Sequence, residues 1–383
     1  MDFLPPFRAW AEVDLDRLVN NYRELSKAAS CAVVMCVVKA NAYGHGAATC
    51  ARKLEEAGCT NFGVATLEEA VELRKGGINS KILVFNHIDE KMVPDALELG
   101  IDLTVYSYEA ARAVSRHAKS PTGVHIKLDT GLNRVGFKPQ EALRQIAKIN
   151  ALQNIHIEGV FTHLASAFLP DRTYTVFQTE VFLDIVKELE SAGIRVGVKH
   201  MANSAAVISH PDTHFDMVRV GISLYGCYPS EEAESSGVAL LPCMSLKSCI
   251  FRLIELEPGQ AVSYGGLFVT KRKTKLATIP IGYADGVSAV LTGKLEVLVN
   301  GQRAPVVGKI CMDQCMVDVT DVEGEVSLFD EVVIFGEQKG GFIPVEQPAG
   351  QIGTINYEML CMVSRRVPRY YVEGGKIVGR VEF

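Results

Sequence analysis

The stretch CAVVMCVVKANAYGHGA, residues 31–47, decides how the rest of the chain is interpreted. Its apolar run ends in one lysine, Lys39, and a turn that contains Tyr43, Gly44 and His45 follows at once. Because the run is short and rich in β-branched residues, it predicts a buried strand rather than a membrane span. Many strands end in a lysine that simply reaches water. A lysine at the exit of a buried strand can also lose its proton easily, since burial disfavours the charged amine, and a Schiff-base lysine needs that environment.

Further β-rich runs follow this strand, and helical stretches separate them. The runs lie at 61–66, 81–85, 102–106, 123–132, 158–165, 198–204 and 217–226. One helical stretch opens with Thr66, has Glu69 three residues later and stops at Gly76–Gly77, the pattern of a capping box and a glycine stop. The alternation predicts an α/β chain with a (β/α)8 TIM barrel, because βα units build parallel strands. An open doubly wound sheet is the alternative, but the G-x-G-x-x-G turn typical of it is absent after the first strand.

The sequence pattern changes after about residue 238. Strand-like runs joined by Gly, Asn-Gly or Pro-Gly turns predict a mostly antiparallel β domain there. We therefore expect a barrel over residues 10–237 and a β domain over residues 238–383, with residues 1–9 packed against the β domain.

Composition excludes several classes of protein. The net charge of −6 and the lack of a large basic cluster argue against a nucleic-acid binder. No apolar run reaches ~18 residues, and MDFLPPFRAW at the start does not look like a signal peptide, so we expect no membrane association. The 10 cysteines have irregular spacings without a zinc pattern. They predict reduced thiols, a cytoplasmic protein and no metal.

Polar side chains occupy positions that should face the inside of the barrel. Strand alternation over residues 123–132 directs His125, Lys127 and Asp129 inward, and Arg134 lies just past the strand end. Polar groups inside a barrel are costly unless they are paired. They therefore indicate either a local Lys127–Asp129 pair or a site near the barrel mouth, where barrel enzymes place their chemistry.

The last two barrel strands predict a phosphate site. Arg219 and Gly221 face inward on one strand, and Ser204 follows the strand before it. Barrels often bind phosphate with the loops after strands seven and eight, so Ser204 and the Gly221–Ile222 backbone form the expected cradle. His163 is a candidate stacking ring, although a lone histidine is more often part of the core. Together with Lys39 this set fits pyridoxal phosphate, and a Schiff-base aldolase of a sugar phosphate would also fit the lysine and the cradle.

Nine strings of the chain resemble the alanine racemase family, in the order of that family. They are VVKANAYGHG, KLDTGLNRVGF, FTHLA, NSAA, VRVGISLYG, VSYGG, IGYADG, ICMDQ and INYEML. Each string is weak alone, but nine in order across nearly the whole chain are highly specific. The resemblance implies a pyridoxal-phosphate-dependent isomerase that interconverts L- and D-alanine by two-base α-proton transfer. It also implies a homodimer and a supply of D-alanine for peptidoglycan precursors.

The resemblance further implies a role for each matching residue. Lys39 would hold pyridoxal phosphate and act as one base, and Tyr264 of the other subunit would be the opposite base. The other cofactor-binding residues would be Tyr43, Arg134, His163, Asn203, Ser204, Arg219, Gly221, Ile222 and Tyr357. Arg219 would face the pyridine nitrogen. The substrate would meet Arg134, Met312, Asp313 and Tyr283, the last at the entrance. Lys127 would be carbamylated and would orient Arg134.

Three related activities compete with this interpretation. The first is a racemase for serine, lysine or a broad set of amino acids. Relatives of broad specificity carry export signals, and serine-preferring relatives replace the tyrosine at the position of Tyr357, so both features favour alanine here. The second is a pyridoxal-phosphate carrier of the same barrel type, which would lack residues 238–383 with Tyr264. The third is a decarboxylase with the same barrel-plus-β layout, whose motifs differ from these.

Overall fold

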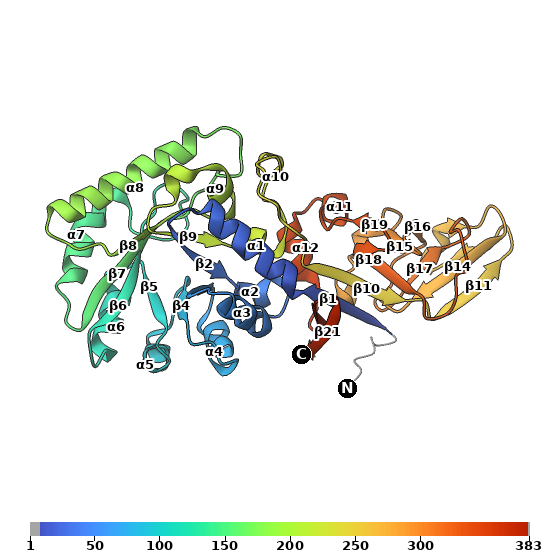
Figure 1. Cartoon of the computed structure of the whole chain (residues 1–383), viewed down its shortest axis with the longest axis horizontal. Helices are drawn as coiled ribbons and strands as arrows, with labels where there is room; N and C mark the ends of the chain where they lie inside the picture. The colour runs from blue at the N-terminus through green and yellow to red at the C-terminus, as the bar shows by residue number, and fades with distance from the viewer. Residues whose placement is uncertain (1–7, 382–383) are drawn as a thin grey trace. The chain divides into compact units, whose positions relative to one another are not determined.

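The computed structural model describes residues 8–381, and the chain forms two compact units (Figure 1). We call Leu18–Ala42 and Ala47–Leu241 the barrel unit. We call residues 8–17, the short segment Tyr43–Gly46 and residues 242–381 the β unit. No helix within the described range is long and apolar enough to cross a membrane.

The barrel unit is a closed parallel barrel, which confirms the predicted (β/α)8 TIM architecture. Its strands, in spatial order, are β2 (Val33–Val37), β3 (Asn61–Val64), β4 (Lys81–Val84), β5 (Asp102–Val105), β6 (Thr122–Lys127), β7 (Ile155–Phe161), β8 (Val198–His200) and β9 (Met217–Val220). The last strand closes on the first, with Met35 opposite Arg219. Met35, Leu83 and Met217 form an apolar cluster inside this unit.

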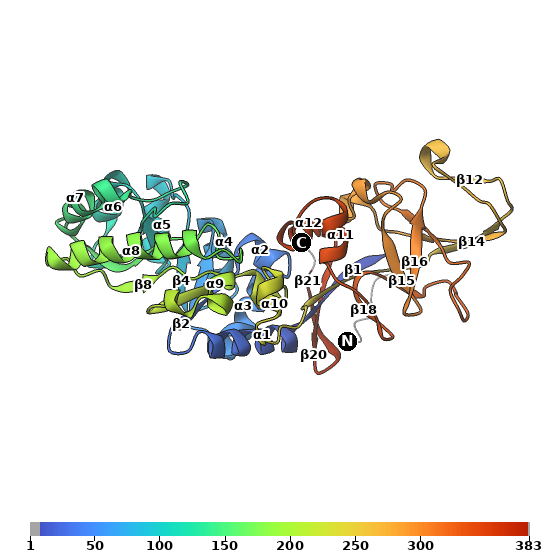
Figure 2. The same cartoon turned by 90° about the horizontal axis from the view of Figure 1, so that it is seen from above.

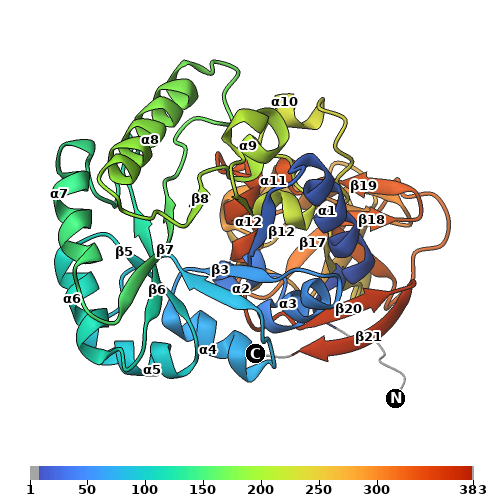
Figure 3. The same ribbon diagram turned by 60° about the vertical axis from the view of Figure 1, so that its left-hand side comes forward.

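Helices stand outside the barrel strands, as Figure 3 shows for α4 to α8. The helices are α1 (Leu15–Ala28), α3 (Ala47–Glu56), α4 (Leu67–Lys75), α5 (Val93–Glu98), α6 (Tyr108–His117), α7 (Pro139–Asn150), α8 (Thr173–Ser191), α9 (Ser204–Ser209) and α10 (Glu231–Glu234). The predicted capping box is present at α4, where Thr66 caps the helix and Glu69 reaches back to it. Gly76 is the C-cap, and Gly77 follows with a φ of 86°.

The β unit contains a large sheet that is antiparallel except where β1 pairs with β20, so the predicted β class is confirmed. Its strands are β1 (Ala9–Asp14), β10 (Met244–Cys249), β11 (Arg252–Leu256), β14 (Thr274–Ile279), β15 (Glu296–Val299), β16 (Gln302–Val307), β17 (Cys315–Asp318), β18 (Glu331–Gln338), β19 (Gly341–Ile343), β20 (Arg369–Glu373) and β21 (Lys376–Val381). Helices α11 (Glu346–Gln351) and α12 (Asn356–Met362) precede β20. A small ribbon of β12 (Ala261–Val262) and β13 (Phe268–Val269) lies apart from the large sheet (Figure 2).

The division between the units differs from the expected boundaries at the start of the chain. Residues 10–17 were expected in the barrel, but β1 hydrogen-bonds with β10 and β20 in the β unit. The physical reason is the backbone ladder, in which Ala9 lies opposite Ser248 and Ala11 opposite Arg369. Of the expected 1–9 segment, residues 1–7 lie outside the described range.

Candidate active site

Lys39 lies just beyond β2, where the chain enters a left-handed turn, α2 (Lys39–Tyr43). The strand expected over residues 31–40 ends at Val37, and the residues from Ala40 to Tyr43 all have φ between 51° and 55°. Left-handed helical geometry costs an L-residue roughly 1–2 kcal/mol, so the turn needs support. The Ala42 N–H donates to the Val38 carbonyl at 2.9 Å, and the Ala40 N–H donates to Glu69 Oε1 at 2.6 Å. These bonds fix the backbone at Lys39.

The candidate phosphate cradle lies on the strand beside Lys39. β2 and β9 are parallel neighbours, with Cys36 opposite Val220, so Lys39 and Gly221 leave the barrel at the same edge. The Ser204 hydroxyl, which is buried, accepts a hydrogen bond from the Gly221 N–H at 2.9 Å. The structure therefore brings together the lysine and the two predicted cradle loops.

Two further groups of the cradle have no hydrogen-bond partner. Within residues 8–381, no acceptor is bonded to the Ile222 N–H, which opens the 3-10 turn η3 (Ile222–Tyr225). The buried Ser223 hydroxyl also lacks a partner among the described atoms. Asn203, the N-cap of α9, uses its side chain to accept from the Ala206 N–H at 3.1 Å. Asn203 therefore shapes the loop rather than presenting its carbonyl oxygen.

Arg219 lies inside the barrel, as predicted, and is 5% exposed. Its guanidinium donates to the carbonyls of His200, Thr162 and Met201 at 3.0, 2.7 and 3.1 Å. His163 Nδ1 lies 3.3 Å from Arg219 Nη2. Burial lowers the pKa of Arg219 to about 9, and the charge of Arg134 adds to the effect. No carboxylate in the described part of the chain forms an ion pair with Arg219, so its charge remains uncompensated.

A pair of buried histidines extends from Arg219 through the barrel. Arg219 Nη1 lies 3.1 Å from His200 Nδ1, and His200 Nε2 lies 3.1 Å from His125 Nδ1. Because the guanidinium can only donate, His200 Nδ1 must accept, and its Nε2–H then donates to His125. His200 also stacks on Phe161, with ring centroids 4.7 Å apart. A Cβ at Gly159 would lie 2.7 Å from His125 Nδ1, so this position has no room for a side chain.

Lys127 is buried at the end of β6, at 7% exposure. Its Nζ donates to the Leu128 carbonyl at 2.7 Å and lies 5.5 Å from the centre of the Phe161 ring. Burial, with a further contribution from Arg219, lowers the pKa of Lys127 to about 7. A large fraction of this amine is therefore unprotonated at neutral pH.

Asp129 pairs with Lys138 and not with Lys127, which makes the alternative Lys127–Asp129 pair wrong. Asp129 Oδ2 lies 2.9 Å from Lys138 Nζ, and Oδ1 accepts from the Gly131 and Asn133 N–H groups at 3.1 and 2.9 Å. The reason is that β6 ends at Lys127, so strand alternation no longer applies at Asp129. Arg134, beyond this turn, is exposed and makes no hydrogen bond or ion pair with any residue of the described chain.

Four of the predicted substrate and base residues gather in the β unit. Tyr283 opens the 3-10 turn η5 (Tyr283–Asp285), and its N–H donates to the Cys311 carbonyl at 3.1 Å. The Ala284 N–H donates to the Met312 carbonyl at the same distance, 3.1 Å. A Cβ at Gly282 would lie 2.2 Å from the Cys311 carbonyl oxygen, so this close approach requires glycine. Met312 and its neighbour Asp313 are thus held against the turn that carries Tyr283.

Tyr264 joins this group through the residue before it. Ser263 has a φ of 65°, and its hydroxyl donates to the Lys309 carbonyl at 2.8 Å. The Ser263 hydroxyl also lies 3.6 Å from the Cys311 sulfur, which connects the Tyr264 turn to the Met312 loop. Tyr264 is 71% exposed, Met312 52% and Tyr283 45%. These three side chains are therefore presented at the surface of the single chain.

Tyr43 and Tyr357 form a third pair, also in the β unit. Their ring centroids are 6.1 Å apart, and Tyr357 lies on α12. The carbonyl of Gly44, beside Tyr43, accepts from Arg369 Nε at 2.8 Å. Arg369 is 1% exposed and donates also to Val363, Val367 and Ser364 carbonyls.

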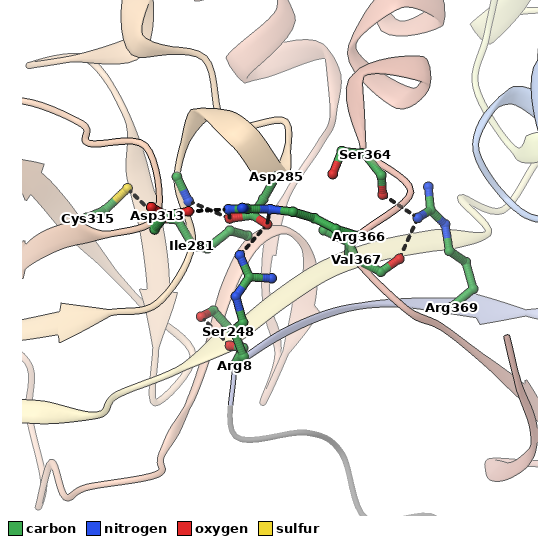
Figure 4. A network of polar contacts seen from close by, with 11 residues as sticks. Arg8, Ser248, Ile281, Asp285, Asp313, Cys315, Ser364, Arg366, Val367 and Arg369 are labelled. Carbon is green, nitrogen blue, oxygen red and sulfur yellow. Dashed lines mark hydrogen bonds and ion pairs between the residues drawn. The ribbon is translucent and has the colours of Figure 1, made fainter. Parts of the chain in front are cut away.

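An ion network that the sequence did not reveal includes Asp313, the residue after Met312 (Figure 4). The fully buried carboxylate of Asp285 accepts from Arg366 Nε at 2.7 Å and Nη2 at 3.1 Å, and from Arg8 Nη2 at 2.5 Å. Arg366 Nη2 also donates to Asp313 Oδ1 at 2.6 Å. The only available signals were the string IGYADG, in which Asp285 had no assigned role, and the arginine-rich stretch RRVPRY.

Comparison with known proteins accounts for both units. The family models of the N-terminal and C-terminal domains of alanine racemase match residues 13–229 and 243–371. An alanine racemase of Clostridium tetani is 45% identical over 97% of each chain. One of Methanococcus maripaludis is also 45% identical, over 95% of this chain and 98% of that one.

Solved structures agree with this assignment. An alanine racemase structure of Clostridium difficile 630 has a TM-score of 0.94 at 39% identity and covers 99% of both chains. A structure of the Bacillus anthracis alanine racemase with bound L-Ala-P has a TM-score of 0.92 at 35% identity, again over 99% of both chains. The chain therefore belongs to the alanine racemase family of amino-acid racemases, which are isomerases.

Proposed function

We propose that this protein interconverts L- and D-alanine with pyridoxal phosphate bound at Lys39. The observation that carries the proposal is the place of Lys39 just beyond β2, the strand that neighbours β9 and Gly221. This edge belongs to a barrel whose interior holds Arg219, a charge with no ion-pair partner among the described residues. Relatives that match both units over nearly their full length are named alanine racemases, and this supports alanine as the substrate.

The residues present fit the cofactor. The free Ile222 N–H and the buried Ser223 hydroxyl suit a phosphate, which accepts hydrogen bonds at every oxygen. The other proposed phosphate ligands would be Ser204, Asn203, Tyr43 and Tyr357, and His163 would stack near the pyridine ring. Pyridoxal phosphate, when bound, supplies an electron sink that makes the α-proton of an amino acid removable.

Lys39 and Tyr264 are the two bases of the proposed reaction. One removes the α-proton from one face of the bound amino acid, and the other returns a proton to the opposite face, so the substrate need not turn over. Arg219 would face the pyridine nitrogen of the cofactor and would keep its own proton, because a guanidinium does not readily lose it. A pyridine nitrogen left unprotonated in this way would weaken the electron sink and limit side reactions such as transamination.

Lys127 is proposed to carry a carbamate. Carbon dioxide adds to an unprotonated amine, and the pKa of about 7 provides that form. The bond formed is between Nζ and the carbon of carbon dioxide, with loss of one amine proton to solvent. The product is an anion, which suits a site next to Arg219 better than a second cation. It would also orient Arg134, which has no partner in the described chain and is proposed to bind the cofactor hydroxyl and the substrate carboxylate.

The active sites are proposed to be completed in a homodimer. Tyr264, Tyr283 and Met312 are exposed side chains that bring large apolar surface to one part of the β unit. Such a cluster suits an interface between subunits, where Tyr264 and Met312 of one chain would face Lys39 of the other. Met312 would then bind the substrate carboxylate through its N–H, because a carboxylate only accepts hydrogen bonds.

The proposed cellular role is the supply of D-alanine for peptidoglycan precursors in the cytoplasm. All ten cysteines are free thiols, which is consistent with a reducing compartment.

Incubation of the purified protein with pyridoxal phosphate and a panel of single L-amino acids tests the proposal. Chiral chromatography should show D-alanine as the main product, with slower formation of D-serine. Absence of D-alanine when cofactor is present would refute the function.

A further inference from the structure

Arg366 is the link between a buried carboxylate and a proposed substrate residue. Its Nε and Nη2 form a two-pronged contact with Asp285, and the same Nη2 reaches Asp313 Oδ1. Asp285 in turn accepts from the Gly282 N–H at 3.0 Å, so its carboxylate closes the turn that carries Tyr283. The Asp285 carbonyl accepts from the Ser364 N–H at 3.1 Å, which places the Arg366 segment directly against this turn.

Asp285 does not depend on Arg366 alone. Arg8 Nη2 lies 2.5 Å from Asp285 Oδ1, and the Gly282 N–H binds the other oxygen. Although burial favours the neutral acid, the hydrogen bonds from Arg366, Arg8 and Gly282 together hold the pKa of Asp285 below its usual range. Loss of Arg366 would therefore leave this buried charge with a cation and a backbone donor, and the fold should persist.

Asp313 has no such second partner. Its side chain is 54% exposed, and Arg366 is the only residue between positions 8 and 381 that contacts its carboxylate. The Met312 loop is otherwise held by backbone bonds to Tyr283 and Ala284, which fix its body but not the Asp313 side chain. Arg366 therefore decides where the Asp313 carboxylate points and how much of its charge is neutralised.

We propose that Arg366 is a positioning residue for substrate binding, which acts by holding and neutralising Asp313 beside the Met312 N–H. The inference rests on the proposed function, in which Met312 binds the substrate carboxylate. A free Asp313 carboxylate next to that N–H would repel the carboxylate of alanine, since like charges at close range oppose binding. With Arg366 in place, the N–H faces a carboxylate substrate without a competing negative charge.

Arg366→Ala is the primary test, measured as racemisation of L-alanine by the holoenzyme. The KM for alanine should rise by about tenfold, the effect of one lost charge-assisted contact, while kcat changes much less. Cofactor retention, followed by absorbance after gel filtration, should not change. Arg366→Lys should recover only part of the KM, because an ammonium cannot span Asp285 and Asp313 as the guanidinium fork does.

Two control variants each remove one arginine that does not contact Asp313. Arg365→Ala alters the adjacent exposed arginine, which makes no ion pair with any described residue. Arg8→Ala removes the other cation on Asp285. Both should keep the KM of the wild type, and Arg8→Ala should lower thermal stability, because it removes one of the two cations on the buried Asp285.

A second substitution at Asp313 distinguishes this positioning role from a merely structural one, because only a charge effect on the KM could be reversed by it. In the Arg366→Ala background, Asp313→Asn removes the exposed negative charge and should return the KM to within about threefold of the wild type. A wild-type KM in Arg366→Ala, an equal rise in Arg365→Ala or a double variant no better than Arg366→Ala would each overturn the inference alone. A wild type that forms no D-alanine would overturn the proposed function and the inference with it.

Discussion

The two groups of proposed site residues differ in how they are held. In the barrel unit, Arg219, His200 and Lys127 are buried, and the side chain of each makes hydrogen bonds inside that unit. In the β unit, Tyr264, Tyr283 and Met312 are exposed and are positioned by their backbones. The first group is held in place by contacts of its side chains inside the barrel, whereas the second has exposed side chains on fixed backbone.

This difference predicts a division of labour. A buried, bonded interior suits a cofactor that stays bound through many turnovers, because its polar partners need not rearrange. Exposed side chains on a firm backbone suit a surface that closes over each substrate. Variants in the barrel unit should therefore affect cofactor and stability, and variants in the β unit should affect turnover and substrate binding.

Lys39→Ala should have the largest effect. We expect activity to fall by about a thousandfold or more, because the proposed base and the proposed covalent anchor of the cofactor are lost together. Cofactor should wash out during gel filtration, which absorbance spectra would show. A variant that keeps both its cofactor and its activity would contradict the proposed roles of Lys39.

Acid should weaken the barrel interior through its histidines. Burial lowers the pKa of His125 to about 4 and holds that of His200 well below its usual range, with Arg219 adding to both effects. Below pH ~6.5 these histidines are protonated in the unfolded chain but remain neutral in the folded one. The free energy of unfolding therefore decreases as the pH is lowered. His125 alone should contribute a loss of about 3 kcal/mol between pH ~6.5 and ~4. Urea unfolding across this range measures it, and an unchanged midpoint would contradict it.

Tyr264→Phe should reduce kcat by about a hundredfold, since a phenyl ring cannot transfer a proton. The side chain is 71% exposed, so stability should change by no more than about 0.5 kcal/mol. Cofactor content should match the wild type, in contrast to Lys39→Ala. Leu267→Ala alters another exposed side chain in the turn between β12 and β13. It is the matched control and should retain activity. Loss of cofactor in Tyr264→Phe would contradict the expectation that variants in the β unit affect turnover and substrate binding but not cofactor binding.

Lys127→Ala should have a smaller effect, a decrease in activity of about tenfold, because Arg134 would lose its proposed anionic partner. Carbon-13 NMR of the enzyme equilibrated with labelled carbon dioxide should show a carbamate signal that this variant lacks. A high-resolution density map with a bare amine at Lys127 would refute the modification.

The barrel was predictable from the sequence because its signals are local. Alternating apolar runs, the capping box at Thr66 and the glycine stop after α4 each constrain their own segment. Strand alternation placed Arg219 and Lys127 inside correctly, but it failed at Asp129, where the strand had already ended. The left-handed turn after Lys39 was beyond this reasoning, since its residues Ala40 and Ala42 have no preference for positive φ.

Long-range partners were the least predictable part of the site. Asp285 and Arg366 are 81 residues apart, and Arg8 lies 277 residues from Asp285. In a sequence, a charged residue near a proline or glycine usually indicates a solvated turn. Only the folded structure shows that Asp285 is fully buried. The strands that pair with β1, namely β10 and β20, are likewise distant from it in the sequence. For this reason the sequence did not predict that residues 10–17 belong to the β unit.

Mixing Lys39→Ala and Tyr264→Ala subunits tests the central claim most directly, that Lys39 and Tyr264 of different chains form one site. Each variant alone should be inactive. After dissociation and random reassociation, half of the dimers should contain one intact site of two, so activity should return to about one quarter of the wild type. Activity that stays at the level of the separate variants, although mixed dimers have formed, would contradict the shared site.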